Sequence, residues 1–89
     1  MPSVLIDFGL EAGLKHLIDY INKLTPNVNI QLFYINDAKE HKSPYEIRIN
    51  LYRIAQEAIN NALKYAKATE ISVSVFRDDT SIRMQIMDN

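Results

Sequence analysis

The first part of the chain changes from a helical to an extended hydrophobic pattern. A short apolar turn at residues 4–8 leads to Gly9. Apolar residues then recur at the three- and four-residue spacing of one helix face: Leu10, Leu14, Leu17, Ile18, Ile21 and Leu24. Thr25-Pro26-Asn27 ends this helix, because proline cannot continue the ladder of hydrogen bonds. Across residues 28–34 the apolar positions alternate instead, which predicts a strand.

A second, longer helix is predicted after a polar loop at residues 36–42. Ser43 can accept a hydrogen bond from the backbone of Glu46, and the Glu46 side chain can reach back to Ser43. Pro44 suits the first helical position, where no backbone donor is needed. This capping box predicts a helix that runs to about Ala68.

Two more alternating segments, 71–75 and 82–86, predict a C-terminal hairpin. The polar residues 77–81, with Asp78-Asp79 at their centre, form the turn between two antiparallel strands. The order helix, strand, helix, strand, strand predicts an α/β two-layer sandwich, with two helices on one face of a mixed sheet. Because the last strand meets the end of the chain at Asn89, we expect the chain to be part of a larger domain.

Composition narrows the class of protein without naming a function. The chain has 89 residues, of which 47% are hydrophobic and 24% charged, so it forms at most one small globular domain. It contains no cysteine and two scattered histidines, which excludes disulfides and makes a zinc site improbable. No run approaches the roughly 18 apolar residues of a membrane helix. A net charge of −1 gives no electrostatic drive toward nucleic acid. We expect a cytoplasmic location.

The second helix separates into an apolar arc and a polar face. On a helical wheel, Glu57, Asn61 and Lys64 fall within about 60° of one another, with Arg53 and Asn60 beside them. The apolar arc is broad and rich in alanine: Leu51, Ile54, Ala55, Ala58, Ile59, Ala62, Leu63 and Ala66.

Two interpretations of this polar face stay open on geometry alone. The first is a solvated helix face with an i,i+4 pair between Arg53 and Glu57. The second is a metal–phosphate site, favoured because asparagine is a poor interior helix residue. An asparagine oxygen is a hard ligand suited to Mg²⁺. Glu57 could hold a metal-bound water or accept a proton, and Lys64 could meet phosphate charge.

The segment LYRIAQEAINNALKYAKATEISVSV resembles the N-box region of the ATP-binding domain of two-component sensor histidine kinases. It is most similar to the subfamily paired with helix-turn-helix response regulators, whose pattern is L-Y-R-I-x-Q-E-A-x-x-N-A-x-K-H-A. The upstream PSVLIDFGLEAGLKHLIDYI and the closing IRMQIMDN also look like that family, the latter like the strand entering its first glycine box. The resemblance spans essentially the whole chain and implies a truncated Bergerat-type ATPase fold.

The resemblance implies roles for five residues of the second helix. Asn61 matches the asparagine that binds Mg²⁺ and helps hold the ATP phosphates. Glu57 matches the glutamate that orients or activates either water or the attacking group. Lys64 matches a basic residue near the phosphates. Asn60 falls where the family varies and has a lesser role. Tyr65 replaces the histidine usual in this subfamily at a nucleotide-contacting position.

Asp88 matches the aspartate that accepts the adenine amino group. Strand parity gives an independent expectation, since Asp88 shares a face with Ile82, Met84 and Ile86 and would lie toward the core. A carboxylate there needs a donor such as the adenine amine. The alternative is a terminal acid pointing into solvent.

Other residues are weaker candidates. His16 and His41 are predicted to lie on the surface, and neither has the context of a phosphoacceptor. Tyr34 and Tyr52 are predicted to be core or rim residues. Phe8 could pack against a helical domain that precedes this one, or belong to the local core.

The resemblance implies that residues 1–89 are the N-terminal half of a histidine kinase ATP-binding domain. The parent enzyme would bind Mg-ATP and pass the phosphoryl group to a histidine on its own dimerisation helix, then to a response regulator. The chain lacks that histidine, the glycine boxes and the ATP lid. We therefore expect no kinase activity and weak or no ATP binding from the chain alone.

Two further expectations concern partners. The strand at residues 81–87 would be an open sheet edge, at which we expect self-association. As the alternative function, the chain is a non-catalytic α/β interaction module that uses the face between Arg53 and Lys64 to contact a protein. A nucleic-acid-binding domain is disfavoured by the net charge and by the lack of a basic, aromatic strand face.

Overall fold

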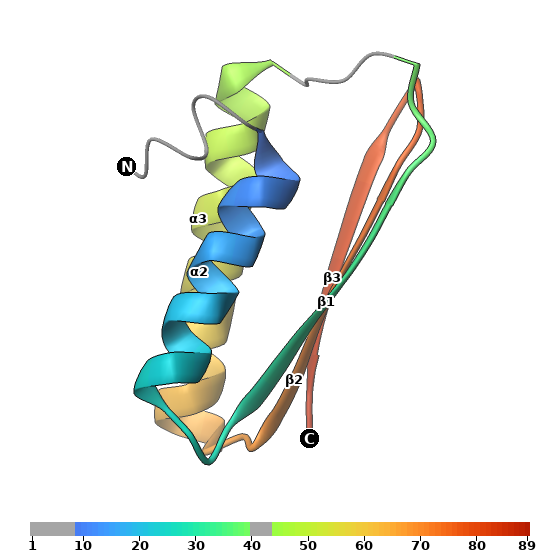
Figure 1. Cartoon of the computed structure of the whole chain (residues 1–89). Coiled ribbons are helices and arrows are strands. Elements are labelled where there is room, and N and C mark those ends of the chain that lie inside the picture. Colours follow the sequence, from blue (N-terminus) through green and yellow to red (C-terminus); the bar gives the residue numbers. More distant parts are fainter. Residues whose placement is uncertain (1–8, 40–43) are drawn as a thin grey trace.

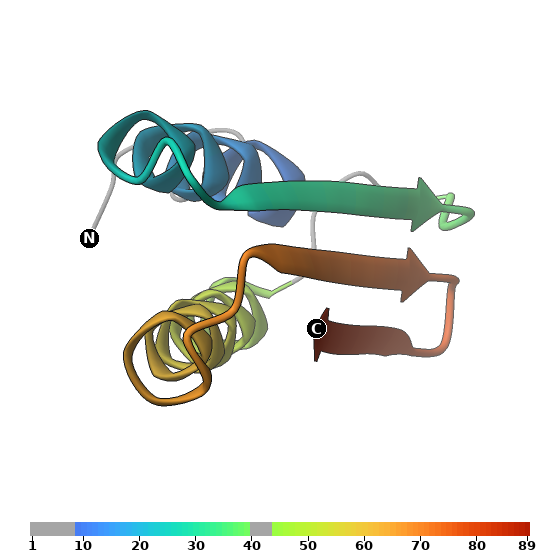
Figure 2. The same cartoon turned by 90° about the horizontal axis from the view of Figure 1, so that it is seen from below.

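Two helices lie on one face of a three-stranded sheet (Figures 1 and 2). The computed structural model describes residues 9–39 and 44–89. Its elements follow the predicted order: α2 (Leu10–Leu24), β1 (Asn29–Asn36), α3 (Tyr45–Asn61), a π-helical turn η1 (Ala62–Ala66), β2 (Glu70–Arg77) and β3 (Ile82–Asp88). The two-layer α+β arrangement predicted from the hydrophobic periods is therefore confirmed.

The sheet is mixed, as predicted, with the strand order β1-β2-β3. β1 runs parallel to β2, and β3 returns antiparallel to it. Val73 at the centre of β2 lies opposite Leu32 on one side and Ile86 on the other. In Figure 2, α2 lies beside β1 and α3 lies on the side of β2 and β3. The helices thus cover the whole width of one sheet face.

The core fills the space between the two layers. Its largest side chains with no measurable exposure are Leu14 from α2, Ile59 from α3 and Val73 from β2. The stripe predicted for α2 is confirmed except at its end, where Leu24 is 62% exposed. The other buried apolar residues come from α2, β1, α3, η1, β2 and the residue Ala68 before β2, whereas β3 contributes only partly buried ones. The buried residues are Leu10, Leu17, Ile18, Ile21, Ile30, Tyr52, Ala55, Ala62, Ala68, Ile71 and Val75.

Helix α3 departs from its prediction at both ends. Pro44 precedes the helix, with an extended backbone of φ −55° and ψ 145°, and Tyr45 is its first residue. The predicted cap Ser43 lies outside the described residues. At the other end the helical turns stop at Ala66 rather than Ala68, because Lys67 adopts a left-handed conformation with φ 50°.

The buried face of α3 is narrower than the predicted apolar arc. Ile54 is 55% exposed and Ala66 is also exposed, whereas Tyr52 is 6% exposed. The buried positions Tyr52, Ala55, Ile59 and Ala62 follow a spacing of three and four residues. Ile54 therefore lies outside the stripe that meets α2 and the sheet.

A tight turn joins β2 to β3. The Asp78 carboxylate accepts backbone hydrogen bonds from Thr80 and Ser81, both at 2.8 Å, and bonds from both hydroxyls. These hydrogen bonds, led by that from the Thr80 backbone, lower the pKa of Asp78. The turn is one residue shorter than predicted, because Arg77 still pairs with Ile82.

One position on the outer edge of β1 is bound by a side chain from α2. Asn22 accepts a hydrogen bond from the Ile30 N–H and donates one to the Ile30 carbonyl, each at 3.0 Å. Its amide thus occupies the outward backbone groups of Ile30, near the start of the strand.

Substituting Asn22 with alanine should cost about 1–2 kcal/mol of stability, because two part-buried hydrogen bonds are lost. Urea unfolding followed by circular dichroism measures the change. Asn27→Ala, at an exposed position in the turn after α2, is the matched control and should stay within about 0.5 kcal/mol. Equal losses in the two variants would contradict the role given to Asn22.

Candidate functional site

The polar face of α3 and η1 forms an open hollow, here called the α3 hollow. It has a volume of about 670 Å³. The residues that line it are Arg53, Gln56, Glu57, Asn60, Asn61, Lys64 and Tyr65. All of the helix residues that the sequence singled out are therefore neighbours on one surface.

The local structure explains why these side chains point outward. Ala55, Ile59 and Ala62 hold the opposite side of the helix in the core, with 7% exposure or less. Lys64 and Tyr65 belong to η1, whose i→i+5 hydrogen bonds make a wider turn than the α-helix. Such π-helical turns are frequent at functional sites.

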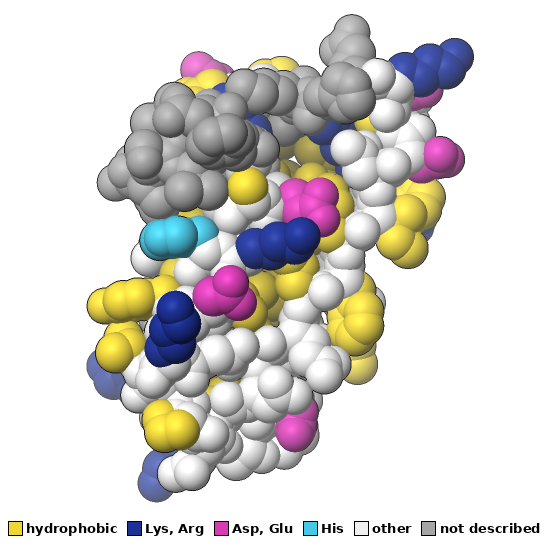
Figure 3. All heavy atoms as spheres, viewed as in Figure 1, with side chains coloured by type: hydrophobic (Ala, Val, Ile, Leu, Met, Phe, Trp, Pro, Cys, Tyr) yellow, Lys and Arg dark blue, Asp and Glu magenta, His cyan; other side chains and the backbone are white. Residues whose placement is uncertain are grey.

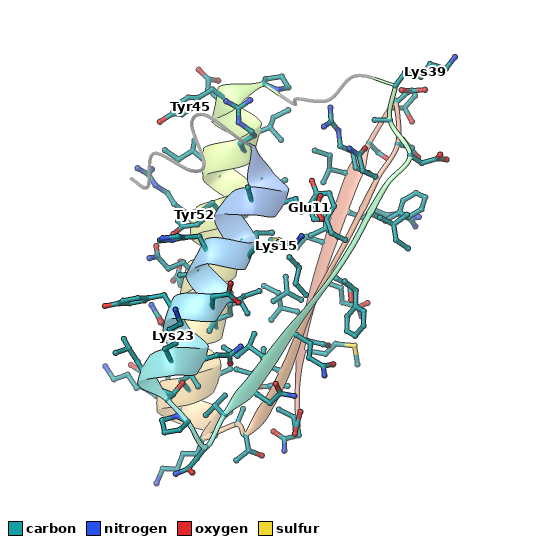
Figure 4. All side chains as sticks on the ribbon, in the orientation of Figure 1. Glu11, Lys15, Lys23, Lys39, Tyr45 and Tyr52 are labelled. Atoms are coloured by element: carbon teal, nitrogen blue, oxygen red, sulfur yellow. The ribbon has the colours of Figure 1, made fainter. Side chains whose placement is uncertain are left out.

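The two cationic side chains of the hollow, Lys64 and Arg53, have different surroundings. The Lys64 ammonium lies 5.2 Å from the centre of the Tyr65 ring, a cation–π contact, and Tyr65 is 72% exposed. Within residues 9–39 and 44–89, no ion pair joins Arg53 to Glu57; an i,i+4 pair forms instead on α2, between Glu11 and Lys15 at 3.6 Å (Figure 4). The ion pair between Arg53 and Glu57 that a solvated helix face would contain is therefore not formed. Glu57 is exposed.

The donor set of the α3 hollow fits magnesium better than a transition metal. The described part of the chain has no group of three or more His, Cys, Asp or Glu side chains that could hold a metal ion. The hollow offers a neutral amide oxygen from Asn61 and a carboxylate from Glu57, one turn apart. Mg²⁺ accepts such a sparse protein shell, because water and substrate phosphates complete its coordination.

Asp88 lies apart from these residues. It pairs in register with Ile71, which keeps the predicted strand parity, but its side chain is exposed at the end of β3. The predicted strand face is therefore confirmed, but Asp88 is not covered there, because few neighbours surround the end of an edge strand. It lines a separate hollow of about 220 Å³. That hollow and the α3 hollow share no residue, although the ends of β3 and η1 lie at the same end of the molecule (Figure 1).

Asn89 holds the end of β3 and was missed by the sequence analysis. Its side-chain oxygen accepts hydrogen bonds from the backbone of Thr69 at 3.0 Å and Glu70 at 3.1 Å. Its amide donates to the Thr69 hydroxyl at 2.9 Å, and its own N–H donates to the Glu70 carbonyl. These bonds fix Asp88 beside the start of β2. The sequence carried no local signal, since the partners are 20 residues away.

Gln56 was also missed as a residue of the α3 hollow. It precedes Asn60 by four residues, so the two amides lie on one helix face. That spacing was the signal that could have found it.

The weaker candidates behave as the sequence predicted where the structure describes them. His16 is exposed on α2, while His41 and Phe8 lie outside the described residues. Tyr52 is buried and Tyr34 half-buried, and burial raises the pKa of both hydroxyls. These two tyrosines are therefore structural.

The fold and the α3 hollow define the described part of the chain as an α+β sandwich with a polar helix face. No protein-family model matches the chain. None of the described helices has the length and apolar character needed to cross a membrane. On the face that carries α2, side chains of both charges are interspersed (Figure 3).

Proposed function

We propose that this chain is the N-terminal part of the ATP-binding domain of a two-component sensor histidine kinase, with a truncated Bergerat-type fold and a cytoplasmic location. The observation that carries the proposal is the α3 hollow. It gathers Glu57, Asn61 and Lys64, the residues to which the resemblance assigns magnesium and phosphate chemistry. The mixed sheet with both helices on one face is compatible with this fold.

Each of these residues has a definite task under the proposal. The Asn61 amide oxygen would ligate Mg²⁺, and the bound ion would neutralise phosphate charge. The Lys64 ammonium moves from the Tyr65 ring to meet a phosphate oxygen. Glu57, one turn before Asn61, orients the attacking group or accepts its proton. Asn60 and Gln56 supply amides at the rim of the hollow.

The adenine end of the nucleotide is assigned to Asp88. Its carboxylate accepts a hydrogen bond from the adenine amine, and Asn89 fixes its backbone by bonds to Thr69 and Glu70. Asp88 and the α3 hollow then bind opposite ends of one ATP molecule. In the parent protein the phosphoryl group goes to a histidine on the dimerisation helix, then to a response regulator.

Mg-ATP should bind weakly to this chain, and Asn61→Ala should weaken binding by about tenfold or more, because the metal loses its protein ligand. Alanine is a better helix former than asparagine, so the substitution leaves α3 intact. A titration followed by amide chemical shifts in NMR measures the effect. The native chain should show shifts that cluster at Glu57, Asn61 and Lys64.

Asn60→Ala is the matched control, since it removes the neighbouring amide from the same hollow. Because Asn60 has only a lesser role at the rim, this variant should weaken binding much less than Asn61→Ala does. The proposal fails if Mg-ATP shifts resonances elsewhere on the chain but none in the hollow, or if both alanine variants lose binding equally.

A protein-interaction module is the second candidate function. Ile47 and Ile54 are 43% and 55% exposed and lie seven residues apart on α3, so they share a helix face. Under this candidate, polar Ile54 variants lose a protein partner while Asn61→Ala changes nothing. The nucleotide titration therefore separates the two functions.

A further inference from the structure

Residues 67–69 lead from η1 into β2 and are bound to the elements on either side. The Ala68 N–H donates to the carbonyl of Ala62, the first residue of η1, at 3.1 Å, and Ala68 is 4% exposed. The Thr69 carbonyl accepts a hydrogen bond from the Asn29 N–H at 2.9 Å, which ties the segment to the start of β1. The connection between the α3 hollow and the sheet is therefore fixed by burial and by hydrogen bonds.

Asn89 binds the same segment to the end of β3. Its side-chain oxygen accepts hydrogen bonds from the backbone of Thr69 at 3.0 Å and Glu70 at 3.1 Å, and its amide donates to the Thr69 hydroxyl at 2.9 Å. Its own N–H donates to the Glu70 carbonyl at 3.1 Å, which continues the antiparallel ladder in which Asp88 pairs with Ile71. Four hydrogen bonds thus link the residue after Asp88 to the start of β2.

The two assigned ends of the nucleotide site lie on different elements. Asn61 and Lys64 belong to α3 and η1, whereas Asp88 is exposed at the last position of β3. A ligand that binds two sites at once gains affinity only when their separation is fixed, because ordering them during binding costs part of the free energy. The bonds from Asn89 to Thr69 supply such a constraint, since they join the end of β3 to the segment that begins at the end of η1.

We propose that Asn89, through Thr69 and Glu70, is a positioning residue that holds Asp88 at a fixed separation from the α3 hollow, so that one nucleotide spans both. This positioning role rests on the proposed function and extends it to a residue that acts through Asp88 rather than through contact with the base or the phosphates. Asn89 should therefore govern how much affinity the adenosine part of ATP adds to that of its phosphates.

Asn89→Ala should lower the affinity for Mg-ATP by about tenfold, while the affinity for Mg-tripolyphosphate stays within about twofold of the native value. Inorganic tripolyphosphate carries the same phosphate chain without the base, so it occupies only the α3 hollow. In NMR titrations, the amide chemical shifts of Asn61 and Lys64 measure the binding of either ligand. Those of Ile71 and Met87, which line the hollow at Asp88, report the adenine end.

Asn89→Asp is the conservative variant, because a carboxylate still accepts the bonds from the backbone of Thr69 and Glu70. It should keep most of the native preference for Mg-ATP over Mg-tripolyphosphate. Asn29→Ala is the matched control, since it removes a side-chain hydrogen bond of 3.4 Å to Glu70 on the β1 side, and it should change neither affinity. Thr69→Val removes only the hydroxyl that Asn89 binds, and it tests the role independently should Asn89→Ala fail to fold.

Native-like Mg-ATP binding by Asn89→Ala and Thr69→Val overturns the positioning role and leaves the proposed function intact. Equal losses of Mg-ATP and Mg-tripolyphosphate overturn it too, because Asn89 then supports the α3 hollow or the fold. When Mg-ATP shifts resonances only outside the α3 hollow, the proposed function fails and the positioning role fails with it. When Mg-ATP causes no shifts at all, the positioning role alone is overturned, because the bonds of Asn89 then do not assemble a site for both ends of the nucleotide.

Discussion

Replacing Val73 with proline should abolish the folded state, the largest effect expected from any single change in this chain. Val73 lies at the centre of the middle strand, is 0% exposed, and faces Leu32 and Ile86. Its N–H points toward β1, because Arg77, which has the same parity, bonds to Asp37 after the end of β1. Proline cannot donate this bond and is confined to edge strands. The carbonyl left unsatisfied on β1 alone costs about 1–3 kcal/mol.

Met84→Pro is the matched control, because β3 is an edge strand and its odd-numbered residues bond to β2, which leaves the N–H of Met84 pointing away from β2. It should leave a cooperative thermal transition, whereas Val73→Pro should show none by circular dichroism. A Val73→Pro chain with native-like melting would contradict the topology β1-β2-β3.

The periodic parts of this fold were predictable from the sequence because burial imposes them. The α2 stripe ending at Ile21, the alternation along β2 and the hairpin at Asp78 all follow from a single apolar face or a local turn. The sequence predicted a mixed sheet but did not specify that β1 pairs with β2. Its register, with Leu32 opposite Val73, depends on contacts distant in sequence and could not be derived from either strand.

The two differences between the predicted and observed α3, the exposure of Ile54 and the earlier end of the helix, depend on packing that the local sequence pattern does not reveal. Ile54 is apolar, yet the stripe centred on Ala55 and Ile59 already fills the interface with the other layer. The last turn widens to a π-helical turn, and it ends at Lys67 in the left-handed conformation, which a non-glycine residue rarely adopts. Both outcomes depend on how the helix meets the sheet.

The candidate site was predictable where it lies on one helix and not where it depends on distant segments. Glu57, Asn61 and Lys64 share a face by spacing alone, so the wheel placed them correctly in one hollow. Asp88 kept its strand parity but not its predicted burial, because exposure depends on neighbours that parity does not specify. The anchoring role of Asn89 depends on Thr69 and Glu70 and has no sequence signature.

Leu14→Ala should lower the free energy of unfolding by about 2–5 kcal/mol, because it removes buried methyl groups and leaves a cavity between the layers. Leu14 is 0% exposed and belongs to the stripe by which α2 joins the core. A domain of this size has a total stability of roughly 5–15 kcal/mol, so the variant is left close to unfolding. The urea midpoint should fall by at least about 1 M with little change in slope.

Leu24→Ala makes the same chemical change in the same helix at a position that is 62% exposed. Its cost should be within about 0.5 kcal/mol, since little apolar surface leaves the core. The difference between the two variants therefore measures burial on α2 with helix propensity held constant. Equal midpoints would mean that α2 does not pack against the sheet through Leu14. The core, and with it the support beneath the α3 hollow, would then have to be assigned to other residues.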